Sequence, residues 1–177
     1  PQKLIDKAQY GAFAGHPKLG AADYKLSCHG LHQRGAYTFC MCPGGTVVAA
    51  ASEKGGVIVN GMSTLARDGE NANSALLVGI DPVDFPSEHP LAGMYYQREI
   101  EQNAFALGGG DYRAPAQLVG DFLADRESRA LGNVQPTCPT GVTLTNLRYC
   151  LPDKVRTTMQ AAITEMDKRL HGFALPD

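Results

Sequence analysis

Residues 36–74 constrain the fold of this chain most, because they combine short apolar segments with tight turns and a polar loop. Side chains at 36–42 alternate between two faces, which predicts a strand. The Pro-Gly-Gly at 43–45 predicts a tight turn into a returning strand at 46–51. A third strand is expected at 57–62. Because tight turns join strands in antiparallel order, we expect a mainly antiparallel sheet.

A dense group of hydrogen-bonding side chains begins in this third strand and continues beyond it. Polar groups carried on a rigid β scaffold are typical of binding and catalytic sites. We therefore select six of them as candidate substrate- or cofactor-facing residues: Asn60, Ser63, Arg67, Asp68, Asn71 and Asn73.

The same region carries a family resemblance. The motifs are FCMCPGG, AASEKGGVIVNGMS and RDGENANSAL, followed by PLAGMYYQREIEQNAFALGGGDYRAPAQLVGDFL and the HGFAL ending. Together they resemble the middle part of the uncharacterised FAD-dependent dehydrogenases, a branch of the NAD(P)/FAD-dependent oxidoreductases. The resemblance covers nearly the whole chain.

This resemblance implies a piece excised from a longer flavoprotein, inserted between the halves of a flavin-binding domain. FAD would then belong to the full-length protein, with NAD(P)H as a possible electron donor. The partners would be the flavin-binding domain of the same parent chain and a small-molecule substrate. We find no GxGxxG between a strand and a helix here, so we expect no flavin on this fragment alone, and no activity from it in isolation.

Composition narrows the class of protein further. A length of 177 residues suits one domain, and 44% hydrophobic and 19% charged residues indicate a globular chain. The net charge of −2 gives no reason to expect nucleic acid or an anionic membrane as partner. No apolar run approaches the roughly 18 residues of a membrane span, and no signal peptide is visible. The five irregularly spaced cysteines indicate a reducing compartment, which we take to be the cytoplasm, and predict no metal site.

Further strands and helices are predicted outside residues 36–74, again from side-chain periodicity and turn residues. Alternation at 23–29 predicts a further strand, and the apolar run at 74–80 predicts another. A short helix is expected at 2–10, and a longer one at 91–107 that three consecutive glycines end.

The remaining helices are expected near the end of the chain. They are a shorter helix at 116–124, a short helix capped by Thr143, and a last helix from Pro152 to about residue 170. The fold class is then α+β in a single domain 1–177, with a mainly antiparallel sheet in 1–85 and a mainly helical part in 86–177.

Cys40 and Cys42 are the candidate catalytic residues. If the strand is regular, their side chains point to the same side. Near a flavin, the two thiols could exchange electrons as a pair, or one thiolate could act as a nucleophile. The alternative is that both are small hydrophobes packed behind a sheet. A disulfide between them would be strained, so we expect them to be unbonded.

The polar loop offers a second kind of chemistry. Arg67 presents a planar fork suited to a carboxylate or a phosphate, and the Asn amides suit a flavin ring edge or a polar substrate. The alternative is that Asp and Asn side chains serve only the turns of the loop itself. We expect the 67–73 loop at the rim of a concave surface near Cys40 or Cys42.

Three hypotheses for function result. In the first, the chain is the substrate-side domain of an FAD-dependent oxidoreductase, covering the flavin and shaping the substrate pocket. In the second, it is a non-catalytic module that binds a partner. In the third, it is a small independent enzyme that uses Cys40 or Cys42. Under the first hypothesis both chain ends should lie close together and on the side of the site, because an inserted segment must leave its host and return.

Overall fold

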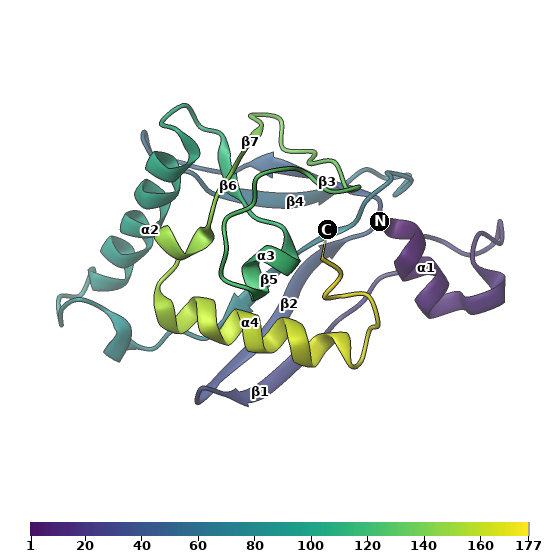
Figure 1. Cartoon of the computed structure of the whole chain (residues 1–177), viewed down its shortest axis with the longest axis horizontal. Helices are drawn as coiled ribbons and strands as arrows, with labels where there is room; N and C mark the ends of the chain where they lie inside the picture. Colours follow the sequence, from purple (N-terminus) through teal and green to yellow (C-terminus); the bar gives the residue numbers. More distant parts are fainter. Residues whose placement is uncertain (177) are drawn as a thin grey trace.

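The computed structural model describes residues 1–176, and its longest strand lies in the middle of a three-stranded sheet (Figure 1). This strand, β2 (Arg34–Cys42), pairs antiparallel with β1 (Ser27–Leu31) on one side and β5 (Asn73–Val78) on the other. β1 begins later than predicted, because the Thr38 hydroxyl accepts the N–H of Leu26 at 2.9 Å and takes the place of a ladder bond. The sheet order is β1-β2-β5.

Two smaller strand pairs complete the β structure. β3 (Gly45–Ala49) and β4 (Val59–Ser63) form an antiparallel pair, in which Thr46 lies opposite Met62. β6 (Ala114–Ala116) and β7 (Val142–Leu144) form a parallel pair. Strands therefore lie mainly in the first half of the chain and pair mainly antiparallel, which confirms the predicted α+β class.

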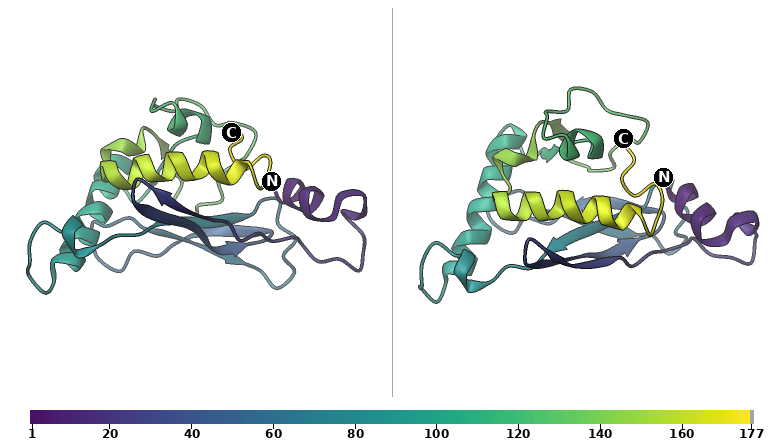
Figure 2. Two further views of the ribbon diagram at one scale, coloured as in Figure 1. Left: turned by 90° about the horizontal axis from the view of Figure 1, so that it is seen from below. Right: turned by 60° about the horizontal axis from the view of Figure 1, so that its bottom comes forward.

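Helices cover one face of these sheets. They are α1 (Gln2–Tyr10), α2 (Ala92–Gly108), α3 (Val119–Leu123) and α4 (Asp153–Asp167), with 3-10 turns η1 (Gly11–Phe13), η2 (Pro82–Asp84) and η3 (Leu147–Tyr149). Figure 2 shows α4 and α3 on the same side of the β layer, with α2 at one end and α1 projecting at the other. Within residues 1–176, no helix lies on the opposite face of the β layer.

The core lies between α4 and the three-stranded sheet. Ala162 and Met166 of α4 pack against Cys28 of β1 and Ala36 of β2. Full burial of a side chain the size of Met166 contributes about 1.5–3 kcal/mol to the free energy of unfolding. The small residues of β1 and β2 on this face allow the helix to approach the sheet closely.

The Pro-Gly-Gly turn does not make the predicted hairpin. β3 pairs with β4, so the turn carries the chain from one sheet into another. The register of β2 against β5 shifts between Phe39 and Cys42, which marks a β-bulge. A bulge bends the strand that contains it, and here it directs the chain out of the three-stranded sheet before the turn.

Two predictions for the 110–145 region were wrong. The segment predicted as a helix from Ala116 starts as strand β6, and α3 begins only at Val119. Thr143 belongs to strand β7, where its hydroxyl donates to the Gly108 carbonyl at 2.5 Å, and Asn146 is the cap of the following turn instead. Local sequence could not show that these two short strands pair with each other.

Both principal helices follow the prediction closely, with one difference at an end. α2 ends at Gly108, and Gly109 adopts a left-handed conformation with φ 110°, which confirms the glycine stop. α4 ends at Asp167, three residues before the predicted end. The Asp167 carboxylate accepts the N–H groups of Gly172 and Ala174 at 3.0 and 2.9 Å, and so turns the chain. These bonds, chiefly the one from Ala174, lower the pKa of Asp167.

Asp177 lies outside the described residues, but the first described residues and the last ones, up to 176, lie near each other, as expected for the chain ends (Figures 1 and 2). Pro1 and Leu175 line one apolar hollow, and Ala72 of the polar loop lines it too. The 67–73 loop is thus placed beside the two ends of the chain.

Candidate functional site

The site is built around the bulge at the end of β2. Cys40 has φ 48°, a left-handed conformation that non-glycine residues adopt rarely. The bulge gives the two cysteines different environments, since Cys40 is exposed whereas Cys42 is 7% exposed. A regular strand, the condition under which both thiols were expected on the same side, is therefore not present here.

The Cys42 thiol is enclosed by protein atoms. Its Sγ donates to the Cys40 carbonyl at 3.2 Å, and a Cβ added at Gly61 would lie 3.3 Å from the same sulfur. Burial raises the pKa of Cys42, and the neighbouring Cys40 raises it further, against the opposing effects of Ser63 and Arg67. Cys42 is thus a protonated thiol near neutral pH, and a weak nucleophile. All five cysteines lie in the described part of the chain and are free.

Gly44 holds the polar loop against the end of β2. A Cβ at Gly44 would overlap the carbonyl group of Arg67, and the Gly69 N–H donates to the Gly44 carbonyl at 3.2 Å. Gly44 and Arg67 both have φ 52°, so each turns the chain sharply where the two backbones meet. This contact requires glycine, because only glycine combines the left-handed conformation with the absence of a side chain.

The first residues of the chain clamp the same turn. Gln2 is 5% exposed, and its Oε1 accepts the N–H of Gly44 at 3.0 Å. Its Nε2 donates to Asp6 Oδ1 and to the Ala22 carbonyl, both at 2.8 Å, while its own N–H donates to the Glu70 carbonyl at 2.9 Å. Sequence reasoning missed this residue, because a glutamine near a chain end carries no local signal of such a role.

Two of the predicted site residues connect backbone segments. Ser63 donates its hydroxyl to the Pro43 carbonyl at 2.8 Å, and Asn73 donates its amide to the Thr46 carbonyl at 3.2 Å. The Asn73 side chain lies over Gly61, where a Cβ would overlap its Oδ1. Asn73 thereby holds β5 to the neighbouring sheet.

Two further candidates form local bonds of the same kind. The side chain of Asn60 accepts the N–H of Gly61 at 2.8 Å, and Asn71 donates to the Gln135 carbonyl at 3.4 Å. These bonds agree with the alternative considered above, in which the amides shape the loop. Each amide still has hydrogen-bonding capacity that these contacts leave unused.

Arg67 and Asp68 differ from the rest of the group. Both side chains are exposed, and neither side chain makes a hydrogen bond or an ion pair within residues 1–176. They line a surface hollow of about 370 Å³ together with Lys3 of α1 and the loop that follows α1. The loop thus borders a concave surface, which neither Cys40 nor Cys42 lines. The positive charge of Arg67 nevertheless acts on the Cys42 thiol.

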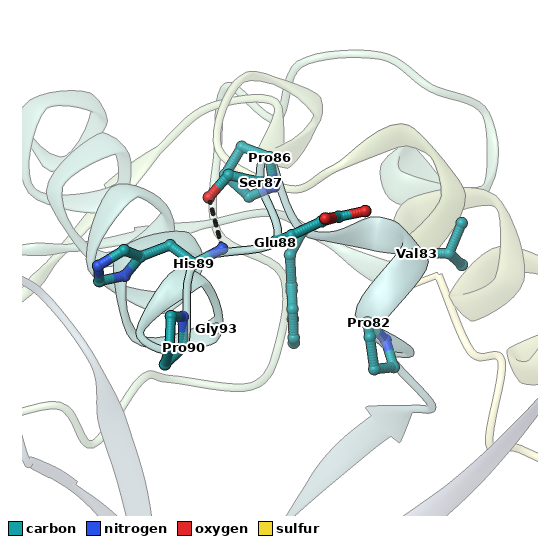
Figure 3. A pocket seen from close by; sticks show the side chains of 9 residues that line it. Pro82, Val83, Pro86, Ser87, Glu88, His89, Pro90 and Gly93 are labelled. Atoms are coloured by element: carbon teal, nitrogen blue, oxygen red, sulfur yellow. Dashed lines mark hydrogen bonds between the residues drawn. The ribbon is translucent and has the colours of Figure 1, made fainter.

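A larger hollow of about 630 Å³ lies elsewhere, at the end of the molecule opposite α1 (Figure 3). Its wall comes from one proline-rich loop, 82–93, with the side chains of Glu88 and His89 among those that line it. The Ser87 hydroxyl accepts the N–H of His89 at 3.4 Å. None of the predicted site residues lines this hollow.

The described residues fit part of a flavin better than the whole of FAD. No helix within 1–176 begins at a glycine-rich turn that follows a parallel strand, which is the arrangement that holds a pyrophosphate in dinucleotide-binding folds. The unpaired guanidinium of Arg67 suits a ring edge or a substrate anion. In the same residues, no three His, Cys, Asp or Glu side chains gather as a metal site would require. None of the helices described is long and apolar enough to cross a bilayer.

Comparison with known proteins identifies the family. The chain is 52% identical over 178 residues to an "Uncharacterized protein" of Clostridium beijerinckii (strain ATCC 51743 / NCIMB 8052). The match takes in 100% of this chain and 33% of the relative, so the chain spans about a third of that protein's length. Residues 1–177 also match the family described as "FAD-dependent protein, C-terminal domain-like". The chain therefore belongs to this family of domains from FAD-dependent proteins.

Proposed function

We propose that this chain is the substrate-side domain of an FAD-dependent oxidoreductase of the dehydrogenase type. It would cover a flavin held by another part of the parent chain and shape the pocket for a small-molecule substrate. The observation that carries the proposal is the family match over residues 1–177. The length of the relative supports it, because a protein about three times longer has room for a separate flavin-binding domain.

Arg67 and Asp68 are the residues with which the domain meets its ligand. Their side chains are exposed at the rim of the hollow and have no partner within 1–176. Bound FAD would supply the redox chemistry. Arg67 would orient an anionic group of the substrate or donate to a flavin carbonyl, and Asp68 would accept from a polar donor. Asn60, Ser63, Asn71 and Asn73 hold the backbone that positions these two side chains.

The two cysteines take different roles in this proposal. Cys40 is exposed beside the loop and is the thiol that contacts the ligand. Cys42 is buried, and burial raises its pKa. Its role is to stabilise the backbone of the bulge, because its thiol donates a hydrogen bond to the Cys40 carbonyl. A positioning role for Cys42 agrees with its protonated state at neutral pH.

Insertion into the flavin-binding domain is part of the proposal. The two ends of the chain lie together, and Gln2 is hydrogen-bonded to the site through Gly44 and Glu70. An inserted domain with this geometry would bring its polar loop to the host on short connections. The order of segments in the parent tests this part. Flavin-binding sequence on both sides of residues 1–177 supports insertion, and flavin-binding sequence on one side alone contradicts it.

The parent protein is the right material for the main experiment. We expect the purified parent to carry FAD and show flavin absorbance, which a screen of NADH, NADPH and candidate substrates would bleach. Substitution Arg67→Ala should leave the FAD content unchanged and weaken bleaching by substrate. Arg113→Ala is the control, because Arg113 is an exposed arginine paired with Asp111 instead of lining the hollow. A parent without flavin would contradict the proposal and favour a partner-binding module.

A further inference from the structure

The three-stranded sheet is covered on one face only. α4 packs on the face that carries Ala36 and Thr38, both of which are buried. Figure 2 shows no helix on the other face of the β layer. Side chains alternate along a strand, so Tyr37 and Phe39, which alternate with these two, point to the uncovered face.

Those residues are aromatic. Tyr37 is 44% exposed and Phe39 is 57% exposed, although they sit in the central strand of the sheet. Tyr37 lies between Ser27 of β1 and Leu77 of β5, and Phe39 lies opposite Ala75 of β5. Cross-strand neighbours share a face, so these five residues form one continuous surface, which we call the open face.

The composition of the open face is that of an interface. None of its five residues carries a charge and two of them are large aromatics, while the exposed Lys25, in register with Phe39, lies at its edge. Exposed sheets in isolated proteins are commonly protected by charged side chains, and aromatic residues are enriched at the cores of protein interfaces. Uncharged aromatics in a central strand therefore indicate a surface that another part of a protein covers.

We infer that the open face is the surface on which the remainder of the parent chain packs. This deepens the proposed function, on which it rests, because it names the contact through which the domain would be held over the flavin. The relative is about three times as long as the matched segment, so a covering partner within the same chain is available.

The position of the candidate site favours the same chain over a second copy as the occupant. The exposed Cys40 follows Phe39 directly, so the open face continues into the candidate site. A flavin-binding domain of the same chain that meets the site would therefore cover the open face as well.

Photo-cross-linking in the full-length parent tests this inference. p-Benzoylphenylalanine is placed at position 39 in one sample and at position 149 in another. Tyr149 is the matched control, because it is an aromatic residue that is 70% exposed and lies in η3, outside the β layer. We expect position 39 to give cross-links to parent residues outside 1–177 within the same polypeptide, and position 149 to give none.

Three results would overturn the inference. These are cross-links between two copies at position 39, no cross-link at position 39, and equal intrachain cross-linking from both positions. The flavin content of the same samples separates this inference from the proposed function. Flavin with no cross-link at position 39 rejects only the open face as the contact. A cross-link in a parent without flavin rejects the flavoprotein proposal and leaves the open face as an interdomain surface.

Discussion

Replacement of Gly44 by alanine should destabilise the domain more than the same replacement at any glycine that only turns the chain. Gly44 has φ 52°, and an alanine in that conformation costs about 1–2 kcal/mol. The added Cβ would also overlap the Arg67 carbonyl, so the loop must move away. That movement strains the bonds that Gly44 makes with Gly69 and Gln2, each contributing about 0.5–1.5 kcal/mol.

We expect Gly44→Ala to lower the free energy of unfolding by about 3 kcal/mol, from these backbone and hydrogen-bond contributions together. Gly55→Ala is the matched control. Gly55 has φ 77°, and a Cβ there meets nothing within 4 Å, so this variant reports the backbone cost alone. Urea unfolding followed by far-UV circular dichroism measures both variants on the same scale.

The difference between the two variants is the informative quantity. If both lose the same free energy of unfolding, within about 0.5 kcal/mol, then Gly44 does not hold the polar loop and the reasoning is refuted. A larger loss at Gly55 than at Gly44 would have the same meaning.

Three further predictions concern other residues. Gln2→Ala should cost about 1–3 kcal/mol in urea unfolding, because it leaves the buried N–H of Gly44 without its acceptor; an unchanged midpoint would contradict this. The ion pair with Arg34, followed by the bond from the Asp81 N–H, lowers the pKa of Asp84 from 3.8 to about 2, so the stabilisation from ionised Asp84 is present above pH 3.8 and is lost as the pH falls toward 2. Asp84→Asn should remove this contribution to the loss of unfolding free energy that occurs between pH 3.8 and about 2. An unchanged dependence of the unfolding free energy on pH would contradict this prediction. Iodoacetamide at pH 7 should label Cys40 before Cys42, as peptide mass spectrometry would show; equal rates would contradict the burial of Cys42.

The helices and strands that could be predicted from sequence are those determined by residues close together in the chain. Periodicity located α1, α2 and α4, and the three glycines from Gly108 located the end of α2. The strands β2, β3, β4 and β5 were also found near their observed positions. Each of these depends on residues close together in the chain, which is why one sequence is sufficient to find them.

What could not be predicted depends on contacts between distant segments. The bulge at Cys40 looks like an ordinary strand position in the sequence, yet it leaves Cys40 exposed beside a buried Cys42 and sends β3 into another sheet. The pairing of β6 with β7 and the hydrogen bond from Gly44 to Gln2 also join segments that are far apart in the sequence. For the candidate site, sequence placed the polar loop after β4 and before β5, but could not tell which of its polar side chains the fold already uses.

The central claim is that Arg67 and its loop face the flavin of the parent protein. The most direct measurement compares the visible absorbance spectrum of the flavin in the parent with that of its Arg67→Ala variant, at equal FAD content and with Arg113→Ala as control. The account predicts shifted flavin bands for Arg67→Ala and an unchanged spectrum for Arg113→Ala, because the first removes a charge beside the ring. A flavin spectrum identical in all three proteins would contradict it.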